Sequence, residues 1–375
     1  MNPERHDIAM VISDLGGGGA QRVVVTLANA WARRGRRVCV ITLSDDSGDQ
    51  YTLTSNVTRV ALGQTGESAT IAAATIANVE RVFGLRKALR RTDSRVVISF
   101  IAVTNILTIV ASVGLGSRVV ISERNDPLRQ SLGMPWDALR RVLYRFADVV
   151  TANSTSAVQS MRAFVPESKL RLVLNPVGVK YIDTLVPRDR RVILNVGRLS
   201  HQKAQDVLLR AFSLVTERVP DWLLVIVGEG PKEVELRKQS KDLGIADRIE
   251  WVGWTTDVAR YYALADIFVL PSRFEGTPNA LLEAMSFGVP SIVTNSSPGS
   301  LEYVQDDVTG LVVPVEDERA LADAVCCLVE NPDLRQRLGA ASKNRVDSLQ
   351  LDNVMDAWDN VVRLRSGGNG KELKM

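Results

Sequence analysis

The chain has 375 residues, of which 45% are hydrophobic and 24% are charged, values typical of a soluble globular protein. They exclude a disordered chain, a collagen and a coiled coil, and the length predicts two domains. Three cysteines are too few for a disulfide framework, and the first residues lack the pattern of a secretory signal, so we expect a reducing, cytoplasmic setting. The only histidines, His6 and His201, make a histidine-based hydrolase or metal site a poor interpretation.

The net charge of +3 conceals an asymmetry between the two halves of the chain. Residues 1–185 contain 23 Lys and Arg against 15 Asp and Glu, whereas residues 186–375 contain 23 against 28. A basic first half indicates an anionic partner, such as a phospholipid, a phosphorylated acceptor or a nucleic acid.

Short β-branched runs alternate with amphipathic helical patterns along the first half. Strands are predicted at 8–12, 37–43, 57–62, 95–100, 118–122, 148–152 and 170–174, and helices at 20–34, 70–91, 104–113, 136–147 and 154–164. The uncharged stretch 96–117 is long enough to span a bilayer. Because it contains several polar residues and two glycines, we interpret it as a buried strand followed by a buried helix.

The second half repeats the scheme. Strands are predicted at 191–196, 222–228, 248–253, 266–271, 290–295 and 310–315, with helices at 205–219, 231–243, 256–265, 278–287, 318–330, 332–346 and 352–364. Continuous apolar strands alternating with helices are typical of a parallel sheet covered on both faces. The fold class is therefore α/β, with two doubly wound, Rossmann-like domains expected to face each other across a cleft.

A charged, proline-containing stretch near 183–191 marks the expected domain boundary. We predict a first domain over 1–184 and a second over 185–350. A C-terminal helix at 351–365 is expected to pack back toward the first domain, and the Gly-rich tail 366–375 to be disordered.

Ligands of open parallel sheets bind beyond the carboxyl ends of the strands, and glycines gather there in this sequence. The run Gly16–Gly19 follows the first strand and opens a helix, where the backbone can approach an anion. It matches neither the dinucleotide-binding G-x-G-x-x-G pattern nor a P-loop, so a plain tight turn is the alternative.

Two cations follow the first strand of the second half. Arg198 comes directly after Gly197, and Lys203 lies just before a helix. Two fixed cations suit a diphosphate whose charge grows as it leaves, and a solvated basic loop is the alternative.

The most specific element is Glu275-Gly276-Thr277-Pro278-Asn279-Ala280-Leu281-Leu282-Glu283. Pro278 suits the first turn of a helix, and Thr277 or Gly276 can cap it. A carboxylate accepts two hydroxyl hydrogen bonds at once, which suits the vicinal diol of a ribose or hexose. The alternative is a capped helix with ordinary surface acids.

Together these motifs resemble those of the family 4 glycosyltransferases, retaining enzymes of the GT-B type. The motifs that carry the resemblance are LGGGGAQR (15–22), NVGRLSHQK (195–203), VGEGP (227–231), LPSRFEGTPNALLEAMSFGVP (270–290) and TGLVVP (309–314). In GGAQRVVVTLANA and VVISERNDP the first half is similar to bacterial N-acetylgalactosaminyltransferases and related enzymes, which extend sugars on polyprenyl diphosphate carriers.

The resemblance implies roles for individual residues. Arg198 and Lys203 would hold the donor diphosphate and act with Glu275 in catalysis, and losing one cation would raise the barrier by about 3 kcal/mol. Glu283 would hold the ribose. The remaining donor-binding residues would be Gly18, Gly19, Gly197, Gly276, Thr277, Asn279 and Ala280. The acceptor would attack from the front face, with the leaving phosphate taking its proton.

The acceptor side departs from the family pattern. Glu123 is followed by Arg124, where many relatives have histidine, and Gln21 stands where they often have Glu. In the predicted helix 136–147, Leu139, Val142, Leu143 and Phe146 form one apolar stripe. Arg140, Arg141, Tyr144 and Arg145 share the other face. This face is expected to meet a lipid diphosphate or anionic headgroups, and a solvated basic face is the alternative.

The expected function is a retaining glycosyltransferase that moves a hexose or N-acetylhexosamine from a nucleotide sugar to a glycan. On family grounds the donor is UDP-linked and the acceptor is a polyprenyl-diphosphate-linked saccharide. No cofactor or metal is expected, since no Asp-x-Asp occurs in the chain. Peripheral attachment to the inner face of the cytoplasmic membrane is expected, and nucleic acid is not. The alternatives are a GT-B sugar-nucleotide epimerase and a non-catalytic protein that binds anionic ligands or membranes.

Overall fold

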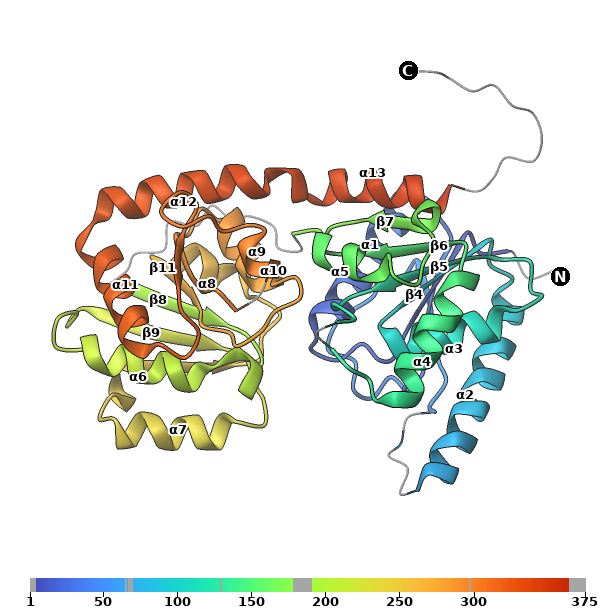
Figure 1. The fold of residues 1–375 in the computed structure, drawn as a ribbon, viewed down its shortest axis with the longest axis horizontal. Helices are drawn as coiled ribbons and strands as arrows, with labels where there is room; N and C mark the ends of the chain where they lie inside the picture. Colours follow the sequence, from blue (N-terminus) through green and yellow to red (C-terminus); the bar gives the residue numbers. More distant parts are fainter. Residues whose placement is uncertain are drawn as a thin grey trace, which may run out of the picture. The chain divides into compact units, whose positions relative to one another are not determined.

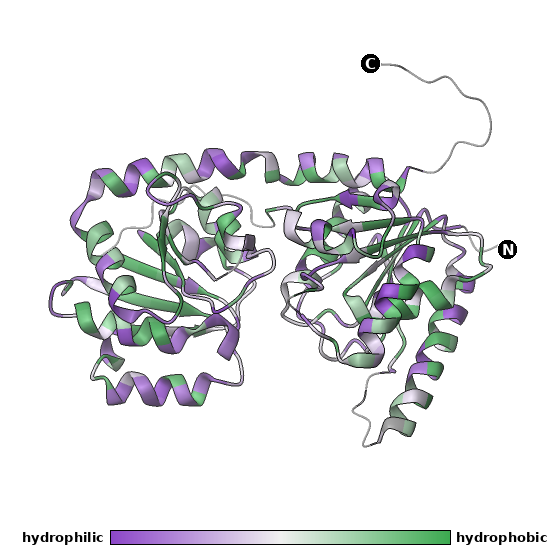
Figure 2. Cartoon of the chain, viewed as in Figure 1, coloured by the Kyte–Doolittle hydropathy of each residue, from purple (hydrophilic) through white to green (hydrophobic). Residues whose placement is uncertain are grey.

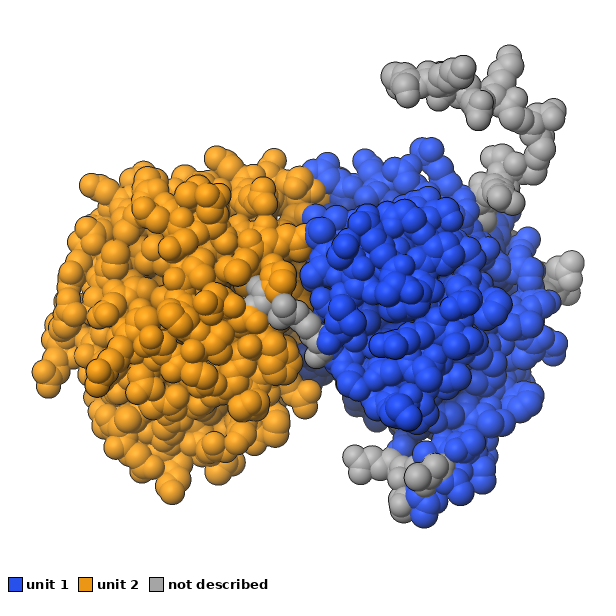
Figure 3. Space-filling model, in the orientation of Figure 1, with its two compact units in different colours: residues 1–174, 352–375 blue, residues 175–351 orange. Residues whose placement is uncertain are grey.

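The computed structural model describes residues 5–64, 66, 70–128, 130–177, 191–296 and 298–363. The chain forms two compact units, drawn in different colours in Figure 3. Unit 1 contains Met1–Leu174 and Asp352–Met375, and unit 2 contains Asn175–Leu351.

Unit 1 is built on a seven-stranded parallel sheet with strand order β3-β2-β1-β4-β5-β6-β7. Its strands are β1 (Ile8–Ile12), β2 (Val38–Thr42), β3 (Val57–Ala61), β4 (Val96–Phe100), β5 (Arg118–Glu123), β6 (Val149–Ala152) and β7 (Leu170–Leu172). The register aligns Ile8 with Val38 on one side and Val96 on the other. Every residue of β1, β2 and β4 is buried, as expected for strands covered on both faces, and the strands are strongly hydrophobic (Figure 2).

Helices cover both faces of this sheet. They are α1 (Gly19–Arg33), α2 (Ile71–Thr92), α3 (Ala102–Ser112), α4 (Met134–Leu143), η1 (Tyr144–Phe146), α5 (Thr155–Met161), η2 (Glu167–Lys169) and α13 (Leu351–Val362). Helices α2, α3 and α4 lie next to one another along one side of the sheet (Figure 1). Buried side chains of α2 and α3 pack against β1, β2 and β4, whereas α3, η1 and α5 pack against β5 and β6.

The uncharged stretch 96–117 folds as predicted, into buried strand β4 and helix α3. Within the described residues, no helix combines the length and hydropathy needed to cross a bilayer.

The last helix of the chain, α13, packs within unit 1. Trp358 is fully buried, its ring lies edge-on to Trp31 at a centroid distance of 6.2 Å, and Trp31 Nε1 donates to Asp359 at 2.8 Å. Arg34 forms ion pairs with Asp352, Asp356 and Asp359 along the same helix.

Unit 2 repeats the architecture with six parallel strands in the order β10-β9-β8-β11-β12-β13. The strands are β8 (Arg191–Val196), β9 (Trp222–Val227), β10 (Ile249–Gly253), β11 (Ile267–Leu270), β12 (Ser291–Thr294) and β13 (Leu311–Val313). The helices are η3 (His201–Lys203), α6 (Gln205–Val215), α7 (Glu233–Asp242), η4 (Ala246–Arg248), α8 (Ala259–Leu264), α9 (Asn279–Ser286), α10 (Pro298–Leu301), α11 (Glu318–Glu330), α12 (Pro332–Val346) and η5 (Asp347–Leu349).

The division between the units falls between Leu174 and Asn175, ahead of the boundary at 184/185 expected from the sequence. The reason is that the residues after Leu174 bond within unit 2. The Asn175 side chain donates to Asn279, and the Val177 N–H donates to the Leu349 carbonyl. Of the expected boundary stretch near 183–191, all but Arg191 lies outside the described residues, as does the tail 366–375.

Candidate active site

Two loops leave the carboxyl edge of the unit 2 sheet and are joined by an ion pair. Lys203, after β8, donates from Nζ to Oε1 of Glu275, after β11, at 2.5 Å, although 72 residues separate them in the chain. Ser272 Oγ donates to the same carboxylate oxygen at 2.6 Å, and the Glu275 side chain is only 5% exposed. The structure thus brings together two of the residues that the sequence assigned to catalysis.

The local backbone explains how Lys203 reaches Glu275. Lys203 ends the short helix η3, and the next residue, Ala204, has φ 52°, in the left-handed region. Such a backbone is costly for a residue with a Cβ, so the surrounding contacts must hold it. A Cβ at Gly197 would lie 3.4 Å from the Lys203 stem, an ordinary van der Waals contact, so the stem runs directly beside this glycine.

Arg198 occupies the same loop but is exposed. Its carbonyl accepts a hydrogen bond from the side chain of Gln205, which is buried at the start of α6. Among the described residues, no hydrogen bond or ion pair engages the Arg198 guanidinium. The loop is therefore fixed by its backbone, while the charged group is accessible to a ligand.

Arg273 connects these loops, and the sequence analysis missed it. Its guanidinium donates to both carboxylate oxygens of Asp206 at 2.9 and 2.8 Å, to the His201 carbonyl at 2.7 Å, and to Glu316. Its backbone N–H donates to the Gln202 carbonyl. These hydrogen bonds raise the pKa of Arg273. In the sequence, Arg273 is marked only by its position two residues before Glu275. An arginine in a loop is usually interpreted as solvent-exposed, so this position did not single it out as a site residue.

Glu283 lies in α9 at 2% exposure, and its Oε2 accepts a hydrogen bond from the Tyr262 hydroxyl of α8 at 2.9 Å. The start of α9 differs from the prediction. Pro278 is the residue before the helix, with ψ 86°, rather than part of its first turn, and it makes no side-chain cap hydrogen bond. The cap position is therefore Pro278 and not the predicted Thr277 or Gly276.

Glycines at this edge let loops lie against each other. A Cβ at Gly299, in α10, would clash with the carbonyl oxygen of Gly276. One at Gly228 or Gly230 would clash with the carbonyl oxygen of Gly197 or Leu199, respectively. The V-G-E-G-P motif therefore has a packing role, because it supports the loop that carries Arg198.

At the carboxyl edge of the unit 1 sheet, Gly18 precedes α1 and Gly19 begins it, without a side-chain cap. The turn is closed by Asp14, whose Oδ1 accepts from the Gly16 N–H at 2.9 Å and from Gln21 Nε2 at 3.0 Å. This contact accounts for the departure at position 21, since an amide can donate to Asp14 and a carboxylate cannot.

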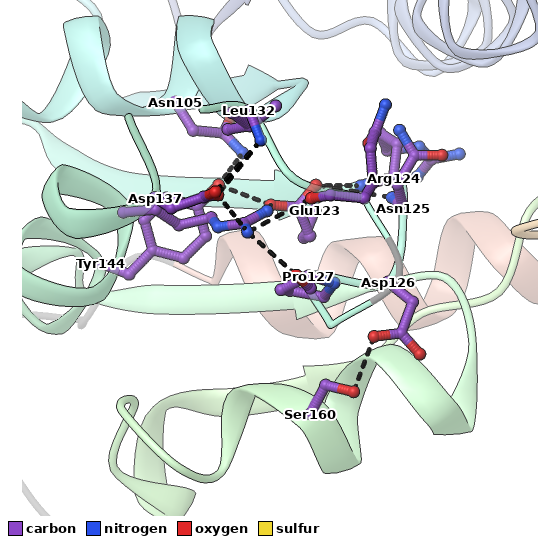
Figure 4. A network of polar contacts seen from close by, with 12 residues as sticks. Asn105, Glu123, Arg124, Asn125, Asp126, Pro127, Leu132, Asp137, Tyr144 and Ser160 are labelled. Carbon is purple, nitrogen blue, oxygen red and sulfur yellow. Dashed lines mark hydrogen bonds and ion pairs between the residues drawn. The ribbon is translucent and has the colours of Figure 1, made fainter. Parts of the chain in front are cut away.

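Glu123, at the end of β5, is the centre of a buried polar network (Figure 4). Its Oε2 accepts from the Tyr144 hydroxyl at 2.7 Å, and its Oε1 accepts from the Arg124 N–H at 3.0 Å. Complete burial raises the pKa of Glu123, and these donors oppose the rise. The Arg124 guanidinium is buried 5.8 Å from the Phe100 ring centroid, and burial lowers its pKa to about 10.

The same network overturns the predicted orientation of α4. Arg140 is 3% exposed, donates to Asp137 at 2.8 Å and lies 4.0 Å from Glu123, and Tyr144 is fully buried. Neither can form a basic surface, although Arg141 and Arg145 are exposed as predicted. The predicted apolar stripe is largely solvent-facing: Leu139, Val142 and Phe146 are exposed, and Leu143 is half-buried.

Comparison with known families identifies the protein family to which these loops belong. Residues 17–181 match the model of Glycosyltransferase Family 4, and residues 182–345 match that of Glycosyl transferases group 1. The chain belongs to the family 4 and group 1 glycosyltransferases. It is 29% identical over 361 residues, 95% of this chain and 98% of the relative, to a Campylobacter jejuni α-1,4-N-acetyl-D-galactosaminyltransferase. That relative is named for its acceptor, GalNAc-α-(1→4)-GalNAc-α-(1→3)-diNAcBac-PP-undecaprenol.

Solved structures confirm the GT-B fold of this glycosyltransferase. Anabaena HepE in complex with UDP and glucose aligns with a TM-score of 0.81 at 15% identity, covering 96% of this chain and 99% of HepE. Sucrose-phosphate synthase from Thermosynechococcus elongatus aligns with a TM-score of 0.80 at 19% identity, covering 95% and 98%. In the part of the chain that the structure describes, no three His, Cys, Asp or Glu side chains are grouped so as to hold a metal ion.

Proposed function

We propose that this glycosyltransferase moves a hexose or N-acetylhexosamine from a UDP-sugar to a polyprenyl-diphosphate-linked saccharide, with retention of configuration. The acceptor class is supported by the Campylobacter relative, which matches nearly the whole chain and is named for an undecaprenol-linked acceptor. The nucleotide is supported by HepE, whose structures hold UDP and UDP-glucose.

The observation that carries the proposal is the joining of the two donor-site loops through Lys203 and Glu275, next to the accessible guanidinium of Arg198. When the sugar–phosphate bond breaks, negative charge builds on the departing diphosphate. In this proposal Arg198 and Lys203 stabilise that charge, and they take the part that a metal ion plays elsewhere. Turnover is therefore expected to persist in a chelator.

Glu283 holds the ribose in this proposal. Tyr262 fixes its carboxylate in the second turn of α9, and a carboxylate can accept hydrogen bonds from both hydroxyls of the ribose diol. The residues around Glu275 face the donor sugar: Gly276, Thr277, Asn279 and Ala280, with Gly18, Gly19 and Gly197 admitting the phosphates.

Retention is assigned to front-face attack. The acceptor hydroxyl oxygen forms the new bond to the anomeric carbon on the side from which the diphosphate leaves, and a phosphate oxygen takes the hydroxyl proton. This step needs no histidine base, in agreement with a site built from Arg198, Lys203 and Glu275.

Unit 1 binds the acceptor at the inner face of the cytoplasmic membrane, to which the protein attaches peripherally. Glu123 and Arg124 act there indirectly. Both side chains are buried, so they hold the loop after β5 in shape rather than meeting the lipid. Arg140 belongs to the same supporting network, which leaves Arg141 and Arg145 as the exposed cations of α4 and η1.

A donor screen tests the proposal. The protein is mixed with UDP-, GDP- and ADP-sugars, and the thermal shift and sugar release are recorded for the wild type, Glu283→Gln and Glu217→Gln. We expect one UDP-sugar to raise the melting temperature of the wild type and of Glu217→Gln, an exposed control in unit 2, but not of Glu283→Gln. An equal shift in all three proteins would contradict the ribose assignment. Release of a rearranged free sugar without an acceptor would favour the epimerase.

A further inference from the structure

The outer side of α4 and η1 is apolar. Met134 is 88% exposed and Phe146 is 66% exposed, and Leu139 and Val142 between them are also solvent-facing. Surface helices of globular proteins ordinarily turn their apolar stripe to the core. Here the stripe faces away from it.

The buried network explains this orientation. Arg140 and Tyr144 are four residues apart and so lie on one side of the segment, where Arg140 bonds to Asp137 and Tyr144 bonds to Glu123. Rotating the helix to bury Val142 and Phe146 would bring Arg140 out and leave Glu123 buried without its hydroxyl donor. An unpaired buried carboxylate is costly, so the polar contacts hold the apolar side outward.

The apolar surface continues onto the neighbouring helices. Phe83 of α2 and Val113 at the end of α3 are 67% and 66% exposed. Arg86 ties these two helices together, because its Nη1 donates to the Ala111 and Val113 carbonyls at 2.8 and 2.6 Å. Since α3 packs against both α2 and α4 in one layer (Figure 1), their outer side chains share a surface. We call it the α2–α3–α4 face.

Exposed cations flank this face. Arg141 and Arg145 stand on α4 and η1, and Lys87 and Arg90 continue the exposed side of α2 after Phe83. The acid of α4, Asp137, is bonded to buried Arg140, so it offsets little of the surface charge. Glu80 is the exposed acid of α2. Apolar side chains framed by cations match a bilayer with anionic headgroups.

We propose that the α2–α3–α4 face docks on an anionic lipid bilayer, with α4 lying in the plane of the interface. Val142 and Phe146 enter the acyl boundary, and Arg141 and Arg145 contact lipid phosphates. The inference deepens the proposed function, on which it rests for the lipid-linked acceptor. A second copy of the chain is a poorer occupant, because a two-fold symmetric contact would bring the same arginines of both copies together.

Vesicle flotation of the full chain, without any sugar, tests the face. We expect binding to phosphatidylcholine vesicles that contain phosphatidylglycerol, and much weaker binding to phosphatidylcholine alone. Val142→Glu/Phe146→Glu should weaken partitioning by about tenfold or more. Arg141→Glu/Arg145→Glu should weaken it by about 25-fold or more, since each cation near an anionic surface contributes about fivefold.

Matched controls come from α7 of unit 2, which is largely hydrophilic (Figure 2) and carries Val234 at 83% exposure. Val234→Glu and Lys238→Glu/Lys241→Glu should float like the wild type. The proposal is overturned if the wild type stays with neither vesicle, if the unit 1 variants float unchanged, or if the wild type is a dimer that Val142→Glu/Phe146→Glu dissociates without affecting flotation.

Donor binding, measured on the same proteins by UDP-sugar thermal shift, separates this inference from the proposed function. The substitutions in α4 and η1 should leave that shift unchanged, since these residues lie outside the donor site. Flotation without a donor shift would keep the docking face and reject the transferase assignment. A donor shift without flotation would keep the transferase assignment and reject the docking face.

Discussion

At the scale of single residues, the ammonium group of Lys203 has two competing partners. Lys203 Nζ donates to Glu275 at 2.5 Å, and the proposed diphosphate needs the same ammonium group. Charge-assisted hydrogen bonds are stronger than neutral ones, so a bound phosphate has to compete with the carboxylate for these protons. Under the proposed function, Glu275 both contacts the donor sugar and lowers the affinity for the diphosphate.

Replacing the carboxylate should separate these two effects. Glu275→Gln is expected to bind UDP about threefold to tenfold more tightly, because a neutral amide competes less well for Lys203. Turnover with the UDP-sugar should fall at least about tenfold, because the charged contact to the sugar is lost. Titration calorimetry and steady-state kinetics measure the two quantities, with Glu217→Gln as control. Unchanged UDP affinity would mean that the carboxylate does not restrain Lys203.

Residue chemistry also shows what a sequence can reveal about this site. Lys203, Glu275 and Glu283 were predicted as site residues because they stand in motifs that are visible in the sequence. Arg273 was not, because its importance comes from Asp206 and Glu316, which are distant in the chain. No local pattern marks an arginine whose partners are brought to it by the fold.

At the scale of elements, Arg273 holds three segments of unit 2 together. It bonds to the loop after β8 through the His201 carbonyl, to the start of α6 through Asp206, and to the segment after β13 through Glu316. Glu316 has φ 62°, a conformation that costs energy for a residue with a side chain. Arg273 therefore ties together the loops that carry Lys203 and Glu275, and under the proposed function it is a positioning residue.

Removing Arg273 should have a pH-dependent effect on stability. Burial raises the pKa of Asp206, but the hydrogen bonds and charge of Arg273 outweigh burial and hold it below its usual value. The pair therefore stabilises unit 2 above the unfolded pKa of about 3.9, and this contribution is lost as pH falls through the lower folded pKa. At neutral pH, Arg273→Ala should cost about 2 kcal/mol of unfolding free energy, a figure reduced for partly exposed partners.

The matched control is Arg210→Ala, which removes a more exposed partner of the same carboxylate, 3.5 Å away. Its cost should stay below about 1 kcal/mol. Denaturant unfolding at pH 7 and pH 3 gives both values, and the difference between wild type and Arg273→Ala should narrow at pH 3. Arg273→Ala should also raise KM for the UDP-sugar. A cost that is independent of pH would show that Asp206 is not the partner that matters.

The elements themselves were largely predictable, with one instructive exception. Each strand from β1 to β13 lies where the alternation of apolar runs predicted one, because buried parallel strands leave a strong signal. For α4 the sequence showed an apolar stripe correctly, but the prediction that Arg140 and Tyr144 belong to an exposed basic face was wrong. The orientation of the helix depends on Glu123, which precedes the helix and recruits Tyr144 inward. Periodicity shows which residues form the apolar stripe of a helix, but it does not show whether that stripe faces the core or the solvent.

At the scale of the whole molecule, the first unit is completed by the end of the chain. Unit 1 contains residues up to Leu174 and then Asp352 onward, so its fold needs a helix that follows all of unit 2. The contact surface combines the buried rings of Trp31 and Trp358 with the ion pairs of Arg34. The aromatic contact should dominate, because the Asp352 and Asp356 side chains are 93% and 74% exposed and such pairs contribute little.

Unfolding should therefore occur in two transitions that respond to different substitutions. Trp358→Ala is expected to lower the stability of unit 1 by about 3–5 kcal/mol, since it leaves a large cavity beside Trp31. Arg34→Ala should cost less than about 1 kcal/mol. Trp251→Ala, at a partly buried ring in unit 2, should shift only the other transition. Scanning calorimetry with UDP assigns the transitions, because the nucleotide should raise only that of unit 2. A single transition that shifts alike in all variants would show instead that the two units unfold as one cooperative body.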